Sequence, residues 1–176
     1  MRSASLTVIM FAAILGSPAF AQESSREDFQ KFCEAWEGRW VGQVTWVADW
    51  PGLGKRGDKV TAYWEGRLTD DGNTMIGKFN GGTGSSTSFI FFDPADKQIK
   101  WLWVESGGRV CHTTMHSKDG KWFQKGTSVS PDGSESEYES TVTITDNGDT
   151  HTWTGSGTVD GKKIDDQHDV WHRMHK

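Results

Sequence analysis

The feature that most constrains the fold is a series of tight-turn sequences recurring from residue 39 to the C-terminus. Asp-Gly, Asn-Gly or Gly-Gly pairs separate short alternating runs, at steps of roughly 8 to 14 residues. These pairs favour the positive φ angles of hairpin turns, and a period of two is typical of half-buried strands. The pattern predicts nine or ten strands, at about Arg39–Ala48, Lys59–Thr69, Thr74–Asn80, Thr87–Asp93, Ile99–Glu105, Arg109–Ser117, Trp122–Ser130, Glu135–Thr145, Thr150–Thr158 and Ile164–Met174.

Consecutive hairpins place each strand beside its neighbour in sequence, without a crossover helix. Closing such a meander removes its exposed edges. We therefore expect an all-β fold, an antiparallel up-and-down β-barrel of about 8–10 strands with a short N-terminal helix. An open sandwich is the alternative.

The N-terminus has the pattern of a secretory signal peptide. Arg2 supplies a positive start, Leu6–Leu15 is an apolar run of ten residues, and Ala19-Phe20-Ala21 resembles a cleavage site. The run is too short to span a bilayer as a helix. A buried N-terminal core helix is the alternative. We expect residues 1–21 to be removed and the protein to be periplasmic or secreted.

The remaining 155 residues suit one domain. Residues 22–37 would contain the helix and residues 38–176 the barrel. Within the first part, Ser24 and Glu27 fit a capping box, and four residues share one helical face: Phe29, Phe32, Cys33 and Trp36. Without Arg2 the chain has 18 basic and 24 acidic residues, a net charge of −6. This charge disfavours nucleic acid and anionic membranes as partners, and no second apolar run predicts a membrane span.

Gly38-Arg39-Trp40, which follows the predicted helix, resembles the G-x-W signature of lipocalins and the wider calycin group. That family places an arginine of the last strand over the tryptophan at the closed end of its barrel. The resemblance implies that Arg173 packs against Trp40 in this way. The segment from Phe92 to Trp101, followed by Ser106-Gly107-Gly108, is similar to a group of secreted bacterial lipocalin-like proteins known only as a domain of unknown function.

Tryptophans dominate the faces that we expect to point inward. The chain has 10 tryptophans, and alternate positions of several strands carry them. Aromatic-lined cavities are typical of small-molecule sites. We expect an apolar or aromatic ligand, held by these residues: Trp46, Trp64, Trp101, Trp103, His112, Tyr138 and Trp153. A barrel filled by its own side chains, acting in structure or interaction, is the alternative.

Two cysteines in an exported chain favour one disulfide, between Cys33 and Cys111. Such a bond would close a loop of 78 residues and pin the helix across the barrel. It would contribute on the order of 4 kcal/mol in the chain-entropy model. Two unpaired buried thiols are the alternative.

The histidines do not predict a metal site. His112 and His116 lie four apart on one predicted strand, so about 13 Å separates them. The same holds for His168 and His172. A distant resemblance of the Trp-x-Gly-x-Trp-x-Gly opening to nitrobindin-like barrels implies a haem held by one late histidine, here His168 or His172. We otherwise expect no cofactor.

The sequence contains no G-x-S-x-G, P-loop or H-E-x-x-H motif that would predict an enzyme. Glu65, Glu105 and His112 could act together only if the fold brought them within hydrogen-bond reach. A small barrel enzyme stays an alternative to a binding protein, and the sequence does not define the oligomeric state.

Overall fold

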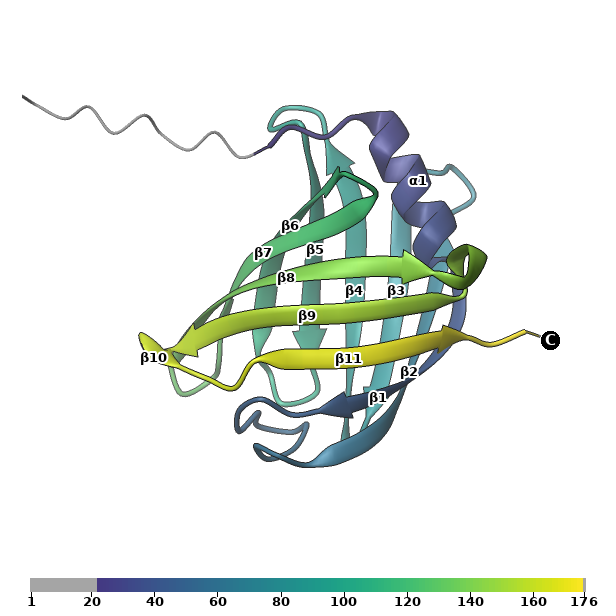
Figure 1. Ribbon diagram of the computed structural model, residues 1–176. Helices are drawn as coiled ribbons and strands as arrows, with labels where there is room; N and C mark the ends of the chain where they lie inside the picture. Colours follow the sequence, from purple (N-terminus) through teal and green to yellow (C-terminus); the bar gives the residue numbers. More distant parts are fainter. Residues whose placement is uncertain (1–21, 176) are drawn as a thin grey trace, which may run out of the picture.

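The computed structural model describes residues 22–175, which form a closed antiparallel barrel of ten strands with one α-helix at its N-terminal side (Figure 1). The helix α1 spans Arg26–Trp36. The barrel strands are β1 (Gly38–Thr45), β2 (Lys59–Leu68), β3 (Thr74–Gly81), β4 (Gly84–Asp93), β5 (Gln98–Glu105), β6 (Val110–Lys118), β7 (Lys121–Val129), β8 (Glu135–Thr145), β9 (Thr150–Val159) and β11 (Gln167–Arg173). The predicted signal peptide lies outside the described residues.

The barrel closes by plain neighbour pairing. Each strand from β1 to β9 pairs with the next in sequence, and β11 lies between β9 and β1. The two-residue β10 (Lys162–Lys163) only extends the end of β9, and η1 (Asp146–Gly148) is a short 3-10 turn. The predicted up-and-down barrel is confirmed, and closure excludes the open sandwich.

The hairpin turns explain most of the agreement between expected and observed strands. At Asp119-Gly120 both φ angles are positive, 50° and 71°, as a type I′ turn requires. Residues 81–85, which separate two predicted strands, form a tight turn in which Gly81 pairs with Gly84, so β4 starts earlier than expected. The last strand begins at Gln167, three residues later than predicted, and Lys162–Lys163 form the separate short strand β10.

The helix begins one residue later than the expected capping box. Ser25 is the N-cap, and its Oγ accepts from the Asp28 backbone N–H at 3.1 Å while Asp28 accepts from the Ser25 N–H at 2.8 Å. Ser24 instead anchors the chain to the barrel. Its N–H donates to the Lys97 carbonyl, and its hydroxyl donates to that of Met115.

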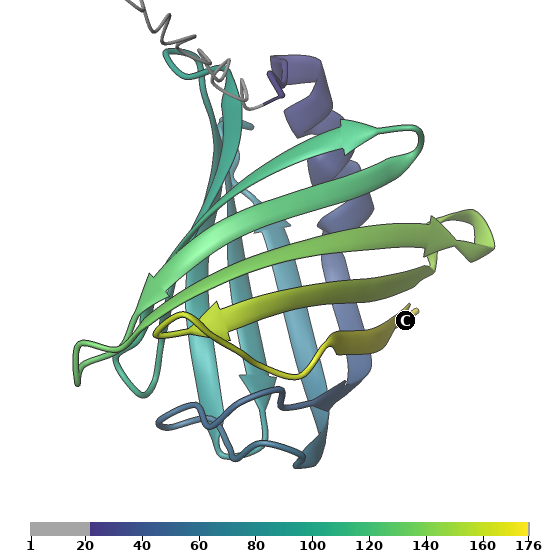
Figure 2. The ribbon, with the colours of Figure 1, turned by 60° about the vertical axis from the view of Figure 1, so that its left-hand side comes forward.

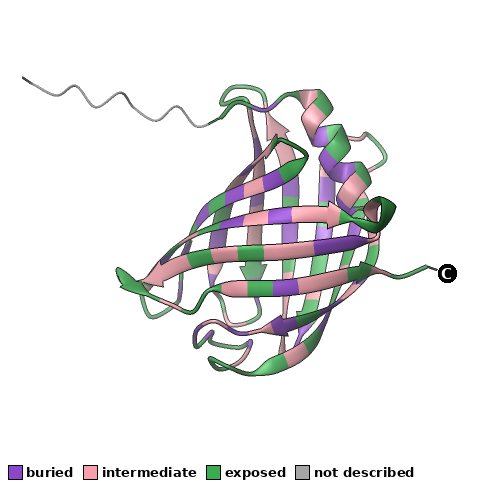
Figure 3. Cartoon of the chain, viewed as in Figure 1, coloured by how far each residue is buried: buried purple, intermediate pink, exposed green. Residues whose placement is uncertain are grey.

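Helix α1 closes one end of the barrel. Figures 1 and 2 show it lying against the end opposite the β1–β2 loop. Phe29, Phe32, Cys33 and Trp36 are buried there with residues from six strands, β3 to β8, among them Met75 and Met115. Buried and exposed positions alternate along most strands, as half-buried strands require (Figure 3). Within the described residues, α1 is the sole α-helix, and it is too short and too polar to cross a bilayer.

Candidate functional site: a tryptophan-lined cavity

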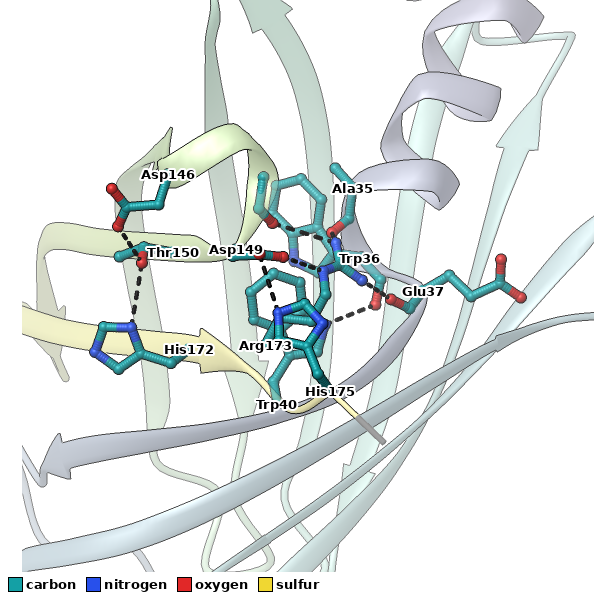
Figure 4. Close-up of polar contacts among 11 residues, drawn as sticks. Ala35, Trp36, Glu37, Trp40, Asp146, Asp149, Thr150, His172, Arg173 and His175 are labelled. Atoms are coloured by element: carbon teal, nitrogen blue, oxygen red, sulfur yellow. Dashed lines mark hydrogen bonds and ion pairs between the residues drawn. The ribbon is translucent and has the colours of Figure 1, made fainter.

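Arg173 clasps the helix end of the barrel (Figure 4). Its guanidinium carbon lies 4.2 Å from the centre of the Trp40 ring, its partner in strand register. It donates to the carbonyls of Glu37 (2.5 Å), Ala35 (3.0 Å) and Gly148 (3.3 Å), and pairs with Asp149 at 3.2 Å. Two of these carbonyls lie at the C-terminal end of α1, where helical partners are lacking. The contact implied by the lipocalin resemblance is therefore present.

Gly38 makes this clasp possible. Its φ of +101° is in the region that glycine favours, and a Cβ there would lie 3.2 Å from Nη1 of Arg173. The glycine turns the chain from α1 into β1 and leaves space for the guanidinium. Gly38, Trp40 and Arg173 thus form one structural unit at the closed end.

Between this base and the opposite mouth lies a cavity of about 270 Å³. Nine of the ten tryptophans line it: Trp36, Trp40, Trp46, Trp50, Trp64, Trp101, Trp103, Trp153 and Trp171. The remaining one, Trp122, packs beneath α1. The barrel is therefore not filled by its own indoles, although tryptophan is the most frequent residue of the cavity wall.

Six of the seven residues predicted to hold a ligand line this cavity: Trp46, Trp64, Trp101, Trp103, Tyr138 and Trp153. His112 does not, and its predicted position is wrong. On β6 the buried positions are Cys111, Thr113 and Met115, so the alternation turns His112 to the exposed outer face. Polar residues occupy both faces of β6, so the alternation of apolar residues around His112 does not show which face is buried.

The mouth is covered by the β1–β2 loop, residues 46–58. The Ser106 hydroxyl donates to the Gly52 carbonyl at 3.1 Å, and that of Thr83 donates to the Leu53 carbonyl at 3.3 Å. Arg56 of the loop donates from Nε to Asp165 at 2.6 Å. These contacts join the loop to three neighbouring turns across the mouth.

A buried ion pair stands beneath this loop. Arg109 donates to Glu105 through Nε at 2.8 Å and Nη2 at 2.5 Å, and its guanidinium lies 3.7 Å from the centre of the Trp50 ring. The Trp103 indole N–H also donates to Glu105, at 3.2 Å. The opposite charges of Arg109 and Glu105 offset each other. Because the pair is bidentate, it fixes the orientation of the guanidinium, which holds Trp50 over the mouth.

Asp169 is a second acidic group on the cavity wall, without a cationic partner among the described residues. Its side chain accepts from the Thr45 N–H at 3.2 Å and from the Gln167 amide at 2.7 Å. The residue is 3% exposed, and burial raises the pKa of its carboxyl. Asp169 was not among the predicted site residues, although it lies two residues from Trp171 and therefore on the same face of β11.

His151 is a further polar residue of the cavity wall that was not among the predicted site residues. It is 2% exposed, with ring centroids 4.0 Å from Trp40 and 4.6 Å from Trp36. In the described part of the chain its Nε2 has no hydrogen-bond partner, and burial lowers the pKa of the imidazole to about 3. The imidazole is therefore neutral at pH 7. Its spacing of two from Trp153 was the available signal.

His112, His168 and His172 do not lie where the haem and enzyme alternatives require them. His168 and His172 are exposed on the outer face of β11, so neither can hold a haem inside the barrel. Glu65 and His112 also face outward while Glu105 faces inward, so the three do not meet. Across residues 22–175 no cluster of His, Cys, Asp and Glu could hold a metal ion.

Both cysteines are buried free thiols, so the predicted disulfide is not formed in this structure. Cys33 lies in the core cluster beneath α1, which includes Met115. Cys111 is four residues from Met115 on the same strand face, about 13 Å further toward the mouth. A disulfide requires Cα atoms about 5–7 Å apart. Burial raises the pKa of each thiol to about 12.

The fold and cavity define a closed antiparallel barrel with an aromatic interior. No family model matches the chain, and no curated protein is significantly similar to it. Among solved structures, the crystal structure of Rv2717c from M. tuberculosis is similar in fold. The TM-score is 0.56 at 12% identity, over 84% of this chain and 98% of that one. At this identity the likeness concerns the fold alone. Ten strands also differ from the eight of lipocalins.

Proposed function

We propose that the protein binds a small aromatic or apolar molecule non-covalently in the tryptophan-lined cavity. The observation that carries this proposal is an unfilled volume of about 270 Å³ with nine tryptophans in its wall. Cores are normally packed to the density of organic crystals, with few voids larger than a water molecule. A filled structural barrel would not leave such a space.

The size and the chemistry of the wall support a compact ring compound. An apolar cavity of about 150 Å³ holds benzene, so this one has space for a larger ring system. Indole faces offer stacking and edge contacts to such a molecule. The Nε1 of Trp101 and the Oγ of Ser88 are buried without hydrogen-bond partners and belong to residues of the wall. They would give a bound molecule polar contacts that fix its orientation.

We further propose that binding takes place in the periplasm or outside the cell, in the manner of lipocalin-like proteins. The signal-peptide pattern of residues 1–21 and the Gly38, Trp40 and Arg173 unit support this part of the proposal. Mass analysis of the mature chain from the exported fraction tests the location. A chain that retains residues 1–21 would contradict it.

The direct test is native mass spectrometry of the gently purified protein, beside the same sample denatured. We expect an added mass that is lost on denaturation, and its value would separate a haem from a smaller metabolite. A bare mass in both samples, together with no binding of any aromatic probe, would overturn the proposal.

A cavity-filling variant makes this test specific. Ser136 is buried on the cavity wall, so Ser136→Phe should fill part of the space and remove the added mass. Thr143→Phe, on the outward-facing side of the same strand, is the matched control and should keep it. Equal retention by both variants would place the bound molecule elsewhere.

A further inference from the structure

We propose that the cavity selects organic cations, namely protonated amines on an aromatic body, with the ammonium group held at Asp169. This inference rests on the proposed binding function and names its ligand class. It is carried by the charge balance of the barrel interior and by the position of one carboxylate in an indole wall.

Asp169 has capacity for a further hydrogen bond on each oxygen. Oδ1 accepts from Thr45 and Oδ2 accepts from Gln167, one bond each. A carboxylate oxygen can accept about two. Both present donors are neutral amides, so neither offsets the negative charge. A ligand ammonium group would supply both the missing donor and the missing charge.

The surrounding elements supply no cation to this carboxylate. Its register partner on β9 is Trp153, and its contact on β1 is the backbone of Thr45. On its own strand His168 points to the outer face, and Asp165 at the rim pairs with Arg56. Within the described chain, Asp169 therefore faces the cavity without a positive neighbour.

The remaining charges of the wall do not change this balance. Six charged residues line the cavity: Glu105, Arg109, Glu137, Glu139, Asp165 and Asp169. Arg109 is the one base, and both oxygens of Glu105 already bind it. Glu137 and Glu139 have exposed side chains. An ionised Asp169 thus leaves the interior with a net charge of −1, which attracts a cation and repels an anion.

The aromatic neighbours of Asp169 suit the same ligand. Trp153 lies directly across in register, and Trp171 is two residues along the same face of β11. Indole faces attract ammonium groups, most strongly where water is excluded. A carboxylate beside indole faces therefore recognises both the charge and the apolar body of an aromatic amine.

A purely structural role for Asp169 makes a different prediction. The Thr45 N–H follows the last register pair between β1 and β11, Gln43 with Val170, and Asp169 satisfies it there. An asparagine could accept the same bond without the charge. Asp169→Asn therefore separates support of the strand end from recognition of a cation.

The experiment compares three probes that share one ring: tryptamine, neutral indole and indole-3-acetate, measured by calorimetry at pH 7. We expect wild-type protein to bind tryptamine at least tenfold more tightly than indole, and indole-3-acetate most weakly. Asp169→Asn should weaken tryptamine binding about tenfold and leave indole binding within twofold. Asp119→Asn, in the exposed turn between β6 and β7 and outside the cavity wall, is the matched control and should change tryptamine binding less than threefold.

The outcomes separate the two proposals. Binding of indole without preference for tryptamine would overturn the cation inference and leave the binding function standing. Equal weakening of indole and tryptamine by Asp169→Asn would also overturn it, because it would indicate a structural role. No binding of any probe would count against both. Even if Asp169→Asn does not fold, the preference of the wild-type protein for tryptamine over indole tests the cation inference.

Discussion

At the scale of single residues, the polar side chains inside this barrel are arranged in contrasting ways. Arg173 and Arg109 each stack on an indole while their guanidinium groups donate to several acceptors. Among residues 22–175, Asp169 has no counter-charge and Nε2 of His151 has no hydrogen-bond partner. Satisfied groups hold structure together, whereas unsatisfied ones are costly unless a ligand completes them.

The first prediction concerns Arg173. Replacement by lysine keeps the charge but removes the planar fork that reaches three carbonyls and covers Trp40. Arg173→Lys should lower the free energy of unfolding by about 2 kcal/mol, as measured by urea titration. Arg67→Lys, on the exposed face of β2, is the matched control and should change it by less than about 0.5 kcal/mol. Similar effects of the two variants would show that the clasp contributes nothing specific.

At the scale of elements, α1 depends on the barrel that it closes. An isolated helix of its 11 residues is marginal in water, so its stability comes from packing of one face. Phe32 stacks on Trp36 at 4.4 Å and meets the edges of Trp101 and Trp122 at 6.0 Å and 5.3 Å. The helix is thereby an integral part of the core.

The second prediction follows from this packing. Phe32→Ala should lower the free energy of unfolding by about 3–5 kcal/mol, because it leaves a cavity among fully packed rings. Denaturant titration followed by tryptophan emission measures the change. Lys31→Ala, on the exposed face of the same helix, should cost less than about 0.5 kcal/mol. A small loss for Phe32→Ala would mean that the barrel end is stable without the helix.

At the scale of the whole molecule, closure couples the protonation of buried groups to folding. β9 completes the barrel by pairing with β8 and β11, and it carries His151 into the interior. The folded pKa of about 3 lies below the usual value of 6.5. Between these values the unfolded chain binds a proton that the folded barrel excludes, so stability falls as the pH is lowered. The raised pKa of Asp169 acts in the opposite sense.

The third prediction is a change in pH dependence. His151→Gln should reduce the loss of unfolding free energy between pH 6.5 and 4, where the histidine contributes up to about 1.4 kcal/mol per pH unit. Urea titrations at several pH values measure this slope. His112→Gln, exposed on the outer face, should leave the slope unchanged. An unaltered slope in His151→Gln would mean that the imidazole is not held neutral.

Much of the fold follows from the sequence because its signals are local. Turn pairs such as Asp119-Gly120 set the hairpins, and alternation of residues such as Tyr138 and Val142 sets which face is buried. Together these determine an antiparallel meander and its inner tryptophans. The helix is likewise predicted by its apolar face, although its N-cap is Ser25 and not the predicted Ser24.

Only the tertiary structure decided which of the polar groups face inward and what they meet there. His112 occurs in a segment with polar residues on both faces, so alternation alone did not assign its side. Alternation places Asp169 on the same face as Trp171, but the closed barrel decides that this face is the inner one. The distance between Cys33 and Cys111, and the pairing of Arg109 with Glu105, depend on contacts across closed strands. Charge, burial and the cavity are properties of the closed barrel, because they arise when distant segments exclude water together.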